Sequence, residues 1–474
     1  MQDGLNTAPA ETNDAAMYTP AVDTMPHPNR LWVSILVFLI PLMLSNTLQS
    51  VSGTVGAIIL GRTLGVDALA AVSVFFPLLL LFISFVIGLG NGSSVLTAQA
   101  FGAKNEERMK AVMGTSLTTA VFLGGVLAIV GGVFTRMVLS SLGTPASILP
   151  VTISFARPIF VTLPILFVSI MYTTLVQGTG DSKRPLHLLA LNTVLNVVFS
   201  PILILGWVGF PRFGVAGAAY AFIAAQTITL MAMIFYLRKL QHPLKVDAEV
   251  LRKLRIDREI LRLLLRLGIP SGVEMIMFSL SEIAVMRLVN GYGPHATAAY
   301  GAVNQVASYV TMPLISLSIA ISIFGAQSIG ANDANRLRKV IKSGVWMNYA
   351  LGSILMVLAY VFAHNILTWF ITNPATLAIA YRLLMITLWS YLILGNLLVL
   401  AGFMKSSGTV LWPMIFTIVA TWLVELPVAY VLSHHIGIDG IWIGYPVSYL
   451  VGLGMQSLYY FRWWKRKEHR RLIG

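Results

Sequence analysis

Twelve apolar stretches, separated by short charged segments, take up most of this sequence. A membrane-spanning α-helix needs about 20 mostly apolar residues, and each stretch is at least that long. The strands of a transmembrane barrel are shorter and alternate in polarity, and a soluble protein could not cover its surface when only 11% of its residues are charged. We therefore predict an all-α integral membrane protein. Its spans are expected over residues 31–61, 70–98, 111–138, 147–176, 185–206, 214–237, 262–290, 297–326, 340–370, 375–404, 409–433 and 438–461.

The positions of Lys and Arg predict how the spans are oriented. Cytoplasmic loops carry an excess of these residues, and 26 of the 32 present lie in one set of loops, in the span ends beside these loops or in the tails, which leaves six elsewhere. These six are Arg62, Arg136, Arg157, Arg212, Arg287 and Arg382. We predict that both termini are cytoplasmic, with Lys405, Trp463 and Trp464 as anchors at the membrane interface. The protein is expected to be a multi-pass component of a bacterial inner membrane.

The formal net charge of +14 follows from the same distribution. Basic segments beside spans contact anionic lipid headgroups, so the charge predicts membrane lipid as a partner rather than nucleic acid. Residues 1–30 are polar and lack the basic start and apolar core of a signal peptide. We expect them to form a disordered cytoplasmic tail.

The sequence contains no constellation of residues that is typical of an enzyme. It has no cysteine, which excludes disulfides and thiolate metal sites. His434 and His435 stand without clustered carboxylates, and no glycine loop of the phosphate-binding type is present. We expect no catalytic residues, no metal and no cofactor.

A ten-residue motif of the first half of the chain recurs in the second half. Gln99–Arg108 reads QAFGAKNEER, and Gln327–Arg336 reads QSIGANDANR. The glycines Gly65, Gly180 and Gly214 likewise recur as Gly293, Gly408 and Gly437. Such internal similarity indicates one structural unit used twice. Because each unit holds six spans, both enter the membrane from the same side, so a pseudo-twofold axis along the membrane normal should relate them.

The repeat divides the chain into five parts. A tail over residues 1–30 precedes an amino-terminal lobe over 31–237. A basic cytoplasmic linker over 238–258 leads to a carboxy-terminal lobe over 259–461 and a basic cytoplasmic tail over 462–474. In a membrane protein, a duplicated bundle is typical of a transporter whose substrate passes between the two halves.

Taken in order along twelve spans, these motifs resemble the multidrug and toxic compound extrusion (MATE) family. The resemblance covers nearly everything after residue 30 and is carried by Gly61–Ala71, the loops after Gln99 and Gln327, Gln177–Pro185, Gly214–Gly217 and Gly437–Gly440. It implies two six-helix lobes around a V-shaped cleft, which alternate between inward- and outward-facing states. It also implies the export of organic, often cationic compounds against entering protons or sodium ions.

The chain departs from the family at three positions that many members use for ion coupling. The aspartate of the first span has no counterpart in Ser52–Ala57. The glutamate two turns after the proline of the span over 262–290 is replaced by Phe278. The span over 375–404 lacks the aspartate that some members have there, and Asn396 is the nearest polar residue. The family's ion-coupling residues therefore cannot be transferred to this chain.

Three acids lie well inside predicted spans, where a charge is costly and usually functional: Glu274, Glu282 and Glu425. Glu274 follows Pro270 by about one turn, and a proline lets a helix bend and frees a carbonyl beside a cavity. Because a desolvated carboxylate can exchange a proton near neutral pH, we predict the leading coupling role for Glu274. Glu282 and Glu425 are further candidates. For each acid, a structural hydrogen-bonding role between helices is the alternative.

Two groups of amides complete the candidate residues. Asn46 and Gln49 follow Pro41, which we expect to be a hinge, as we do Pro270. They either line the cleft between the lobes or pack against neighbouring helices. A second pair on the span over 185–206, Asn192 and Asn196, is expected to make hydrogen bonds between helices.

Together these observations predict an antiporter, coupled to protons or sodium, that exports amphipathic organic compounds by alternating access. One alternative is a flippase for a lipid-linked precursor, but the spans lack the buried Lys and Arg that a pyrophosphate would need. Another is a membrane-embedded enzyme, which would need convergent acids, histidines or a metal site. A channel does not call for duplicated lobes. We expect a monomer.

Overall fold

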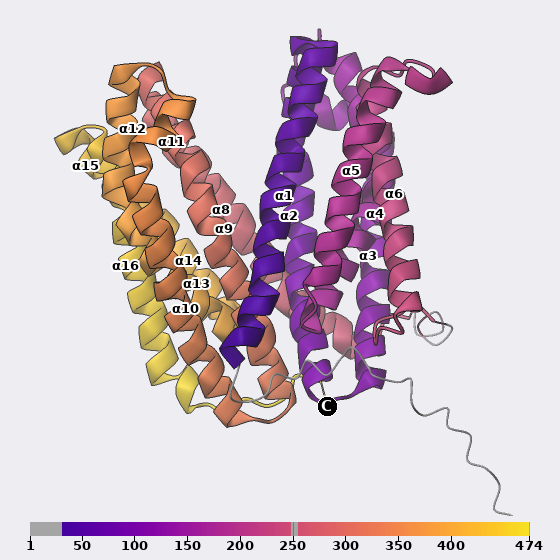
Figure 1. Ribbon diagram of the computed structural model, residues 1–474, viewed down its shortest axis with the longest axis vertical. Coiled ribbons are helices and arrows are strands. Elements are labelled where there is room, and N and C mark those ends of the chain that lie inside the picture. Colours follow the sequence, from indigo (N-terminus) through magenta and orange to yellow (C-terminus); the bar gives the residue numbers. More distant parts are fainter. Residues whose placement is uncertain (1–30, 248–249, 251–254, 474) are drawn as a thin grey trace, which may run out of the picture.

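Two helical bundles lie against each other at one end and diverge toward the other, which confirms the predicted V-shaped pair of lobes (Figure 1). The structure is a computed structural model and describes residues 31–247, 250 and 255–473. All regular structure in this part of the chain is helical. The tail predicted over residues 1–30 lies outside the described residues.

Six long helices make up the amino-terminal bundle. They are α1 (Leu31–Leu64), α2 (Val66–Gly102), α3 (Glu106–Ser141), α4 (Leu149–Gly178), α5 (Lys183–Leu205) and α6 (Val215–Lys239), with the short turn η2 (Trp207–Gly209) between α5 and α6. Their bounds differ from the predicted spans by a few residues, as is usual at helix ends.

The carboxy-terminal bundle repeats this order with more interruptions. Its elements are α8 (Arg258–Asn290), α9 (Pro294–Gly330), α10 (Ala334–Val361), α11 (Ala363–Phe370), α12 (Pro374–Thr387), η3 (Leu388–Ser390), α13 (Tyr391–Lys405), α14 (Leu411–Ile418), η4 (Val419–Glu425), α15 (Leu426–Ile436), α16 (Asp439–Arg462) and η5 (Trp464–Arg466). In the described part of the chain, eleven helical stretches are long and apolar enough to cross a membrane. The twelfth predicted span is α16, which is less apolar because polar residues such as Ser448 and Gln456 recur along it, buried against other helices.

The two repeats have the same backbone geometry at their turns. Lys104 and Asn332 occupy equivalent places in the repeated motif and both have positive φ angles, 54° and 56°. Directly after them, Asn105 caps α3 and Asp333 caps α10, each accepting a hydrogen bond from a backbone N–H three residues on. The three recurring glycine pairs also have positive φ in both copies: Gly65 and Gly293, Gly180 and Gly408, Gly214 and Gly437.

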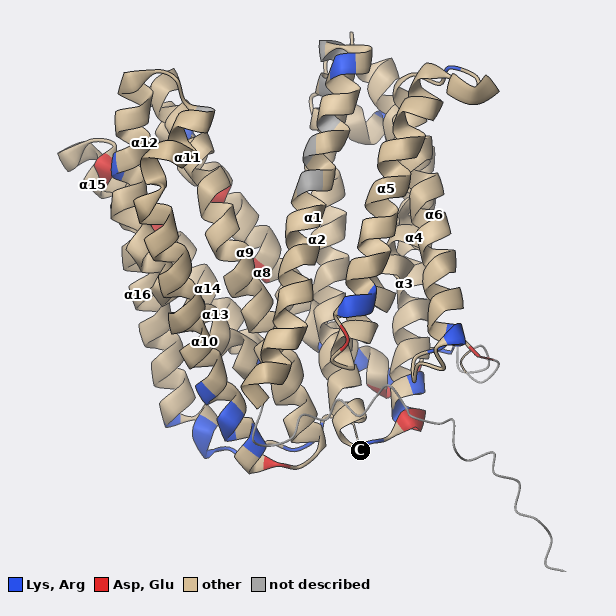
Figure 2. Ribbon diagram, in the orientation of Figure 1, with Lys and Arg blue, Asp and Glu red and all other residues tan. Residues whose placement is uncertain are grey.

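A single apolar core joins the two bundles where they meet. Leu96 of α2, Leu264 of α8 and Phe403 of α13 belong to one cluster of buried side chains. Farther from that end, the carboxy-terminal bundle has a separate core, which includes Val289 and Tyr300. Lys and Arg gather where the bundles meet, and we call this the basic end (Figure 2).

Helix α8 belongs to both bundles. Its first half packs closely on α2, where two Gly-x-x-x-Gly pairs cross: Gly88 and Gly92 on α2, Gly268 and Gly272 on α8. A Cβ added at Gly88 would lie 2.5 Å from the backbone nitrogen of Gly272, so only glycine permits this approach. The second half of α8 packs in the separate core of the carboxy-terminal bundle.

Candidate functional site

Two of the predicted acids lie in one cluster inside the carboxy-terminal bundle. Glu282 of α8 accepts a hydrogen bond from the Tyr300 hydroxyl of α9 at 2.7 Å and a longer one, 3.4 Å, from the Tyr445 hydroxyl of α16. The two hydroxyls are 2.9 Å apart. Glu282 is half-buried, whereas both tyrosines are buried.

The second acid, Glu425, lies deeper and is only 2% exposed. Its Oε2 accepts a hydrogen bond from Ser448 of α16 at 3.0 Å. Ser448 stands one turn from Tyr445, so the two carboxylates bind neighbouring turns of the same helix. They interact electrostatically with each other.

The environment of this carboxylate pair consists of oxygen atoms and aromatic rings. Tyr449 lies with its ring centroid 6.3 Å from those of Tyr391 and Tyr445. Among the described residues, no Lys or Arg forms an ion pair with Glu282 or Glu425. One half-buried and one buried carboxylate without a basic partner can be neutralised by bound protons or by a cation, so the cluster has the chemistry of an ion site.

The backbone at Glu425 has an unusual geometry. Residues Val419–Glu425 form a π-helical stretch between α14 and α15, and Pro427 is the second residue after it. Short π-helical segments are rare and are often found at functional sites. Sequence analysis identified Glu425 but not this local geometry.

Glu274 lies in a different environment from the other two acids. Its Oε2 accepts a hydrogen bond from Lys405 Nζ at 2.6 Å, which forms an ion pair, and its Oε1 accepts a weaker hydrogen bond from the Thr417 hydroxyl at 3.4 Å. Both charged side chains are largely buried, with 15% of Glu274 and 23% of Lys405 exposed. The prediction that Lys405 is an interfacial anchor is therefore wrong, because its ammonium group points into the bundle and neutralises Glu274.

Removing the charge of Lys405 alone is expected to destabilise the protein more than removing the charges of both Lys405 and Glu274. Lys405→Met leaves an unpaired, largely buried carboxylate, with a cost of up to about 3 kcal/mol. Adding Glu274→Gln should recover most of the loss. Thermal unfolding of the purified single and double variants in detergent would measure this coupling. Additive effects of the two substitutions would show that the pair does not stabilise the fold.

The predicted amides have different surroundings in the structure. On α1, Asn46 donates to Ser316 of α9 at 2.8 Å, a contact between the bundles, while Gln49 is exposed. Asn192 donates to Gln226 and Thr229 of α6, at 3.1 and 3.3 Å. The other amide of α5, Asn196, accepts a bond of 3.4 Å from Ser200 of its own helix. The contacts of Asn192 agree with the expected helix-to-helix role.

The predicted hinges lie inside continuous helices. Both α1 and α8 run through their prolines without a break in helical geometry, at Pro41 and Pro270 respectively. A hinge at either position stays a prediction.

The repeated glutamines close the basic end symmetrically. Gln99 Nε2 donates to the Ser406 carbonyl at 2.9 Å, and Gln327 Nε2 donates to the Gly178 carbonyl at 3.2 Å. Each bond runs from one bundle to the end of a helix in the other. Both glutamines are nearly inaccessible, 1% and 2% exposed. The repeat was evident in the sequence, but the contact of each glutamine with the other bundle was not predicted. A polar residue that recurs at the same helix end in both repeats could have indicated such a contact.

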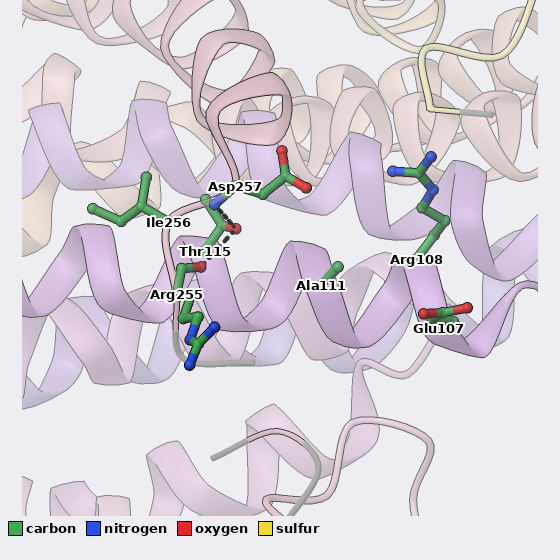
Figure 3. Close-up of a pocket in the computed structure, with 7 residues that line it drawn as sticks. All are labelled: Glu107, Arg108, Ala111, Thr115, Arg255, Ile256 and Asp257. Atoms are coloured by element: carbon green, nitrogen blue, oxygen red, sulfur yellow. Dashed lines mark hydrogen bonds between the residues drawn. The ribbon is translucent and has the colours of Figure 1, made fainter. Parts of the chain in front are cut away.

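A pocket of about 550 Å³ lies beside α3 at the basic end and is lined by Glu107, Arg108, Ala111, Thr115, Arg255, Ile256 and Asp257 (Figure 3). Within it, the Thr115 hydroxyl donates to the Arg255 carbonyl and accepts from the Asp257 N–H. The pocket thus marks where the linker before α8 is fastened to the amino-terminal bundle.

A second attachment of the linker involves Asp247, 3.3 Å from Lys110 of α3. Burial raises the pKa of Asp247, but hydrogen bonds from the Val250 N–H and from Lys110 outweigh it, so the pKa is lowered overall. The carboxylate is therefore ionised at neutral pH.

Comparison with known families finds the same duplication. The family model described as MatE matches residues 41–202 and 270–431, once in each repeat. Among curated relatives, the chain is 54% identical over 445 residues to "Probable multidrug resistance protein YoeA" of Bacillus subtilis (strain 168), covering 94% of this chain and 96% of that protein. It is 24% identical to an "FAD transporter" of Shewanella oneidensis over 84% of this chain and 87% of that one.

Solved structures show the same fold. A point mutant of the Vibrio cholerae MATE transporter VcmN aligns with a TM-score of 0.85 at 18% identity, over 93% of this chain and 98% of that chain. A MATE family transporter described in its outward-facing conformation aligns with a TM-score of 0.82 at 22% identity, over 92% and 95%. With its two bundles, its duplicated motifs and these matches, the chain belongs to the MATE family of membrane transporters.

Proposed function

We propose that this transporter exports amphipathic, often cationic organic compounds across a bacterial inner membrane in exchange for protons or sodium ions. The observation that carries the proposal is the neighbouring pair of the half-buried Glu282 and the buried Glu425, which has no basic partner among the described residues. The name of the 54%-identical Bacillus subtilis relative supports the substrate class.

The orientation follows from the basic end. Its concentration of Lys and Arg favours a cytoplasmic position (Figure 2). Because the bundles are closed at this end by Gln99 and Gln327, the structure corresponds to the state that faces away from the cytoplasm. Both termini then lie inside the cell, next to anionic lipid headgroups.

Coupling follows from the free energy of burying charge. In the outward-facing state Glu282 is half-buried and can receive an ion from outside. Closing the outer halves of the bundles over two ionised carboxylates would cost several kcal/mol per charge. A bound proton or sodium ion removes much of this cost, so the ion-loaded protein can turn inward, release the ion and bind substrate.

A cationic substrate can neutralise the same carboxylates in place of the ion. On α1 there is open space at two glycines, because a Cβ added at Gly53 or Gly56 would meet nothing within 4 Å. Gln49 is exposed on the same helix. We propose that this part of α1, with Asn46, forms the amino-terminal wall of the substrate path, and that Glu274 supports the structure through Lys405. Each monomer then contains a complete path.

A fluorescent cationic dye loaded into vesicles that contain the purified protein should leave faster when a gradient is imposed. Proton and sodium gradients are applied separately, so acceleration by one of them identifies the coupling ion. Protein-free vesicles provide the control for leakage. Equal dye efflux with and without either gradient would contradict the proposal and favour a lipid-linked substrate.

A further inference from the structure

The segment after α16 turns back and runs beneath the basic end toward the amino-terminal bundle (Figure 1). The prediction that Trp464 is an anchor at the membrane interface is wrong, because Trp464 is only 3% exposed, whereas Trp463 is 54% exposed. The Trp464 indole donates to the Ser407 hydroxyl at 2.9 Å, and its ring stacks on His469 with centroids 3.8 Å apart. These contacts direct the following residues toward the closed end.

The last described residues cross from one bundle to the other. The backbone N–H of Leu472 donates to Gln99 Oε1 of α2 at 2.8 Å. On the other side, the Leu472 side chain covers Gly408, where an added Cβ would lie 2.9 Å from its methyl groups. Ile473 is 4% exposed and belongs to the apolar core that joins the bundles. The segment is therefore bound to both halves of the transporter.

This crossing involves the contact that closes the basic end. The amide group of Gln99 donates to Ser406 of the carboxy-terminal bundle and accepts from Leu472, so both its polar atoms bind that half of the chain. Opening the basic end by separating the bundles requires both bonds to break. The tail thus adds contacts to the closed state that a separated state cannot keep.

The first repeat lacks an equivalent crossing among the described residues. After α6, the chain also turns back, but it stays on its own bundle, where the Leu244 carbonyl accepts a hydrogen bond from Tyr172 of α4 at 2.7 Å. The tail therefore breaks the pseudo-symmetry of the closed end on one side.

We propose that Leu472 and Ile473 form a latch that stabilises the state closed at the basic end and must leave Gln99 before that end opens. The proposal rests on the alternation of the two bundles that is part of the proposed function. The tail would then set the fraction of time that the transporter is open toward the cytoplasm.

The latch can be tested without any substrate by measuring the distance between the two bundles at the basic end. The chain has no cysteine, so spin labels can be attached at Glu106→Cys and Ala334→Cys, two exposed and equivalent positions at the basic end. Removing residues 472–474 should raise the ratio of long to short distances by at least about tenfold, as expected for the loss of one hydrogen bond and two buried side chains. Leu472→Pro, which removes the N–H donor and also the leucine side chain over Gly408, should act in the same direction.

The matched control is Arg470→Ala, because the Arg470 side chain is 88% exposed and pairs only with Glu468 among the described residues. It should leave the distances unchanged. Unchanged distances in both the truncated protein and Leu472→Pro would overturn the latch. Since this readout needs neither ion nor dye, a shift in distance would support the latch even if vesicles showed no coupled efflux.

Discussion

Glu282→Gln is expected to reduce gradient-driven efflux to about a tenth of the wild-type rate or less. A glutamine carries no charge, so binding of the ion would no longer change the cost, several kcal/mol, of enclosing a charged side chain. Glutamine keeps the size of the side chain and an oxygen for the Tyr300 hydroxyl. The fold should therefore be retained. Vesicle efflux under the coupling gradient, with protein amount and thermal unfolding measured in parallel, gives the result.

Glu425→Gln should show the same loss, because Glu425 is the buried member of the pair. The control is Glu259→Gln, at the start of the same helix as Glu282, where the carboxylate is 64% exposed. That variant should transport normally. If Glu282→Gln and Glu425→Gln both kept the wild-type response to the gradient, the carboxylate pair would not be the coupling site.

The second large effect is expected from one added methyl group at the basic end. In Gly330→Ala the new Cβ would lie 2.0 Å from the Gln99 carbonyl oxygen, a rigid backbone atom of the opposite bundle. Overpacking of about 1–3 kcal/mol should shift the balance between closed and open basic ends by about 5- to 150-fold. Label distances between Glu106→Cys and Ala334→Cys should lengthen accordingly, and efflux should fall.

The repeat provides a second version of this test. Gly102→Ala places a Cβ 2.1 Å from the Gln327 carbonyl oxygen and should act in the same way. Gly125→Ala, on α3, meets nothing within 4 Å and serves as the control. Distances that stay short in both Gly102→Ala and Gly330→Ala would mean that the bundles can shift locally without opening.

The spans and their duplication could be predicted because they depend on local features of the sequence. An apolar stretch of sufficient length forms a helix in a membrane wherever it occurs. The recurring glycines mark turns with positive φ, as at Gly65 and Gly293. These signals need no knowledge of which helices are neighbours.

The partners of the acids could not be predicted in the same way. Lys405 meets Glu274 across 131 residues, and Tyr445 meets Glu282 across 163. Such contacts depend on how each helix is rotated about its axis, and a membrane gives little guidance because lipid-facing residues are as apolar as the core. The position of Trp464 was missed for the same reason: an aromatic residue beside basic ones can face lipid or a neighbouring helix.

The shared helix α8 has a consequence for synthesis of the protein. Ile260, Leu264 and Leu267, at its start, fill the core that includes the amino-terminal bundle, and Gly268 contacts α2. The first six helices thus leave the ribosome with part of their apolar surface uncovered. They are completed only when translation has passed residue 272, so the amino-terminal half cannot finish folding before the first helix of the second half has been made.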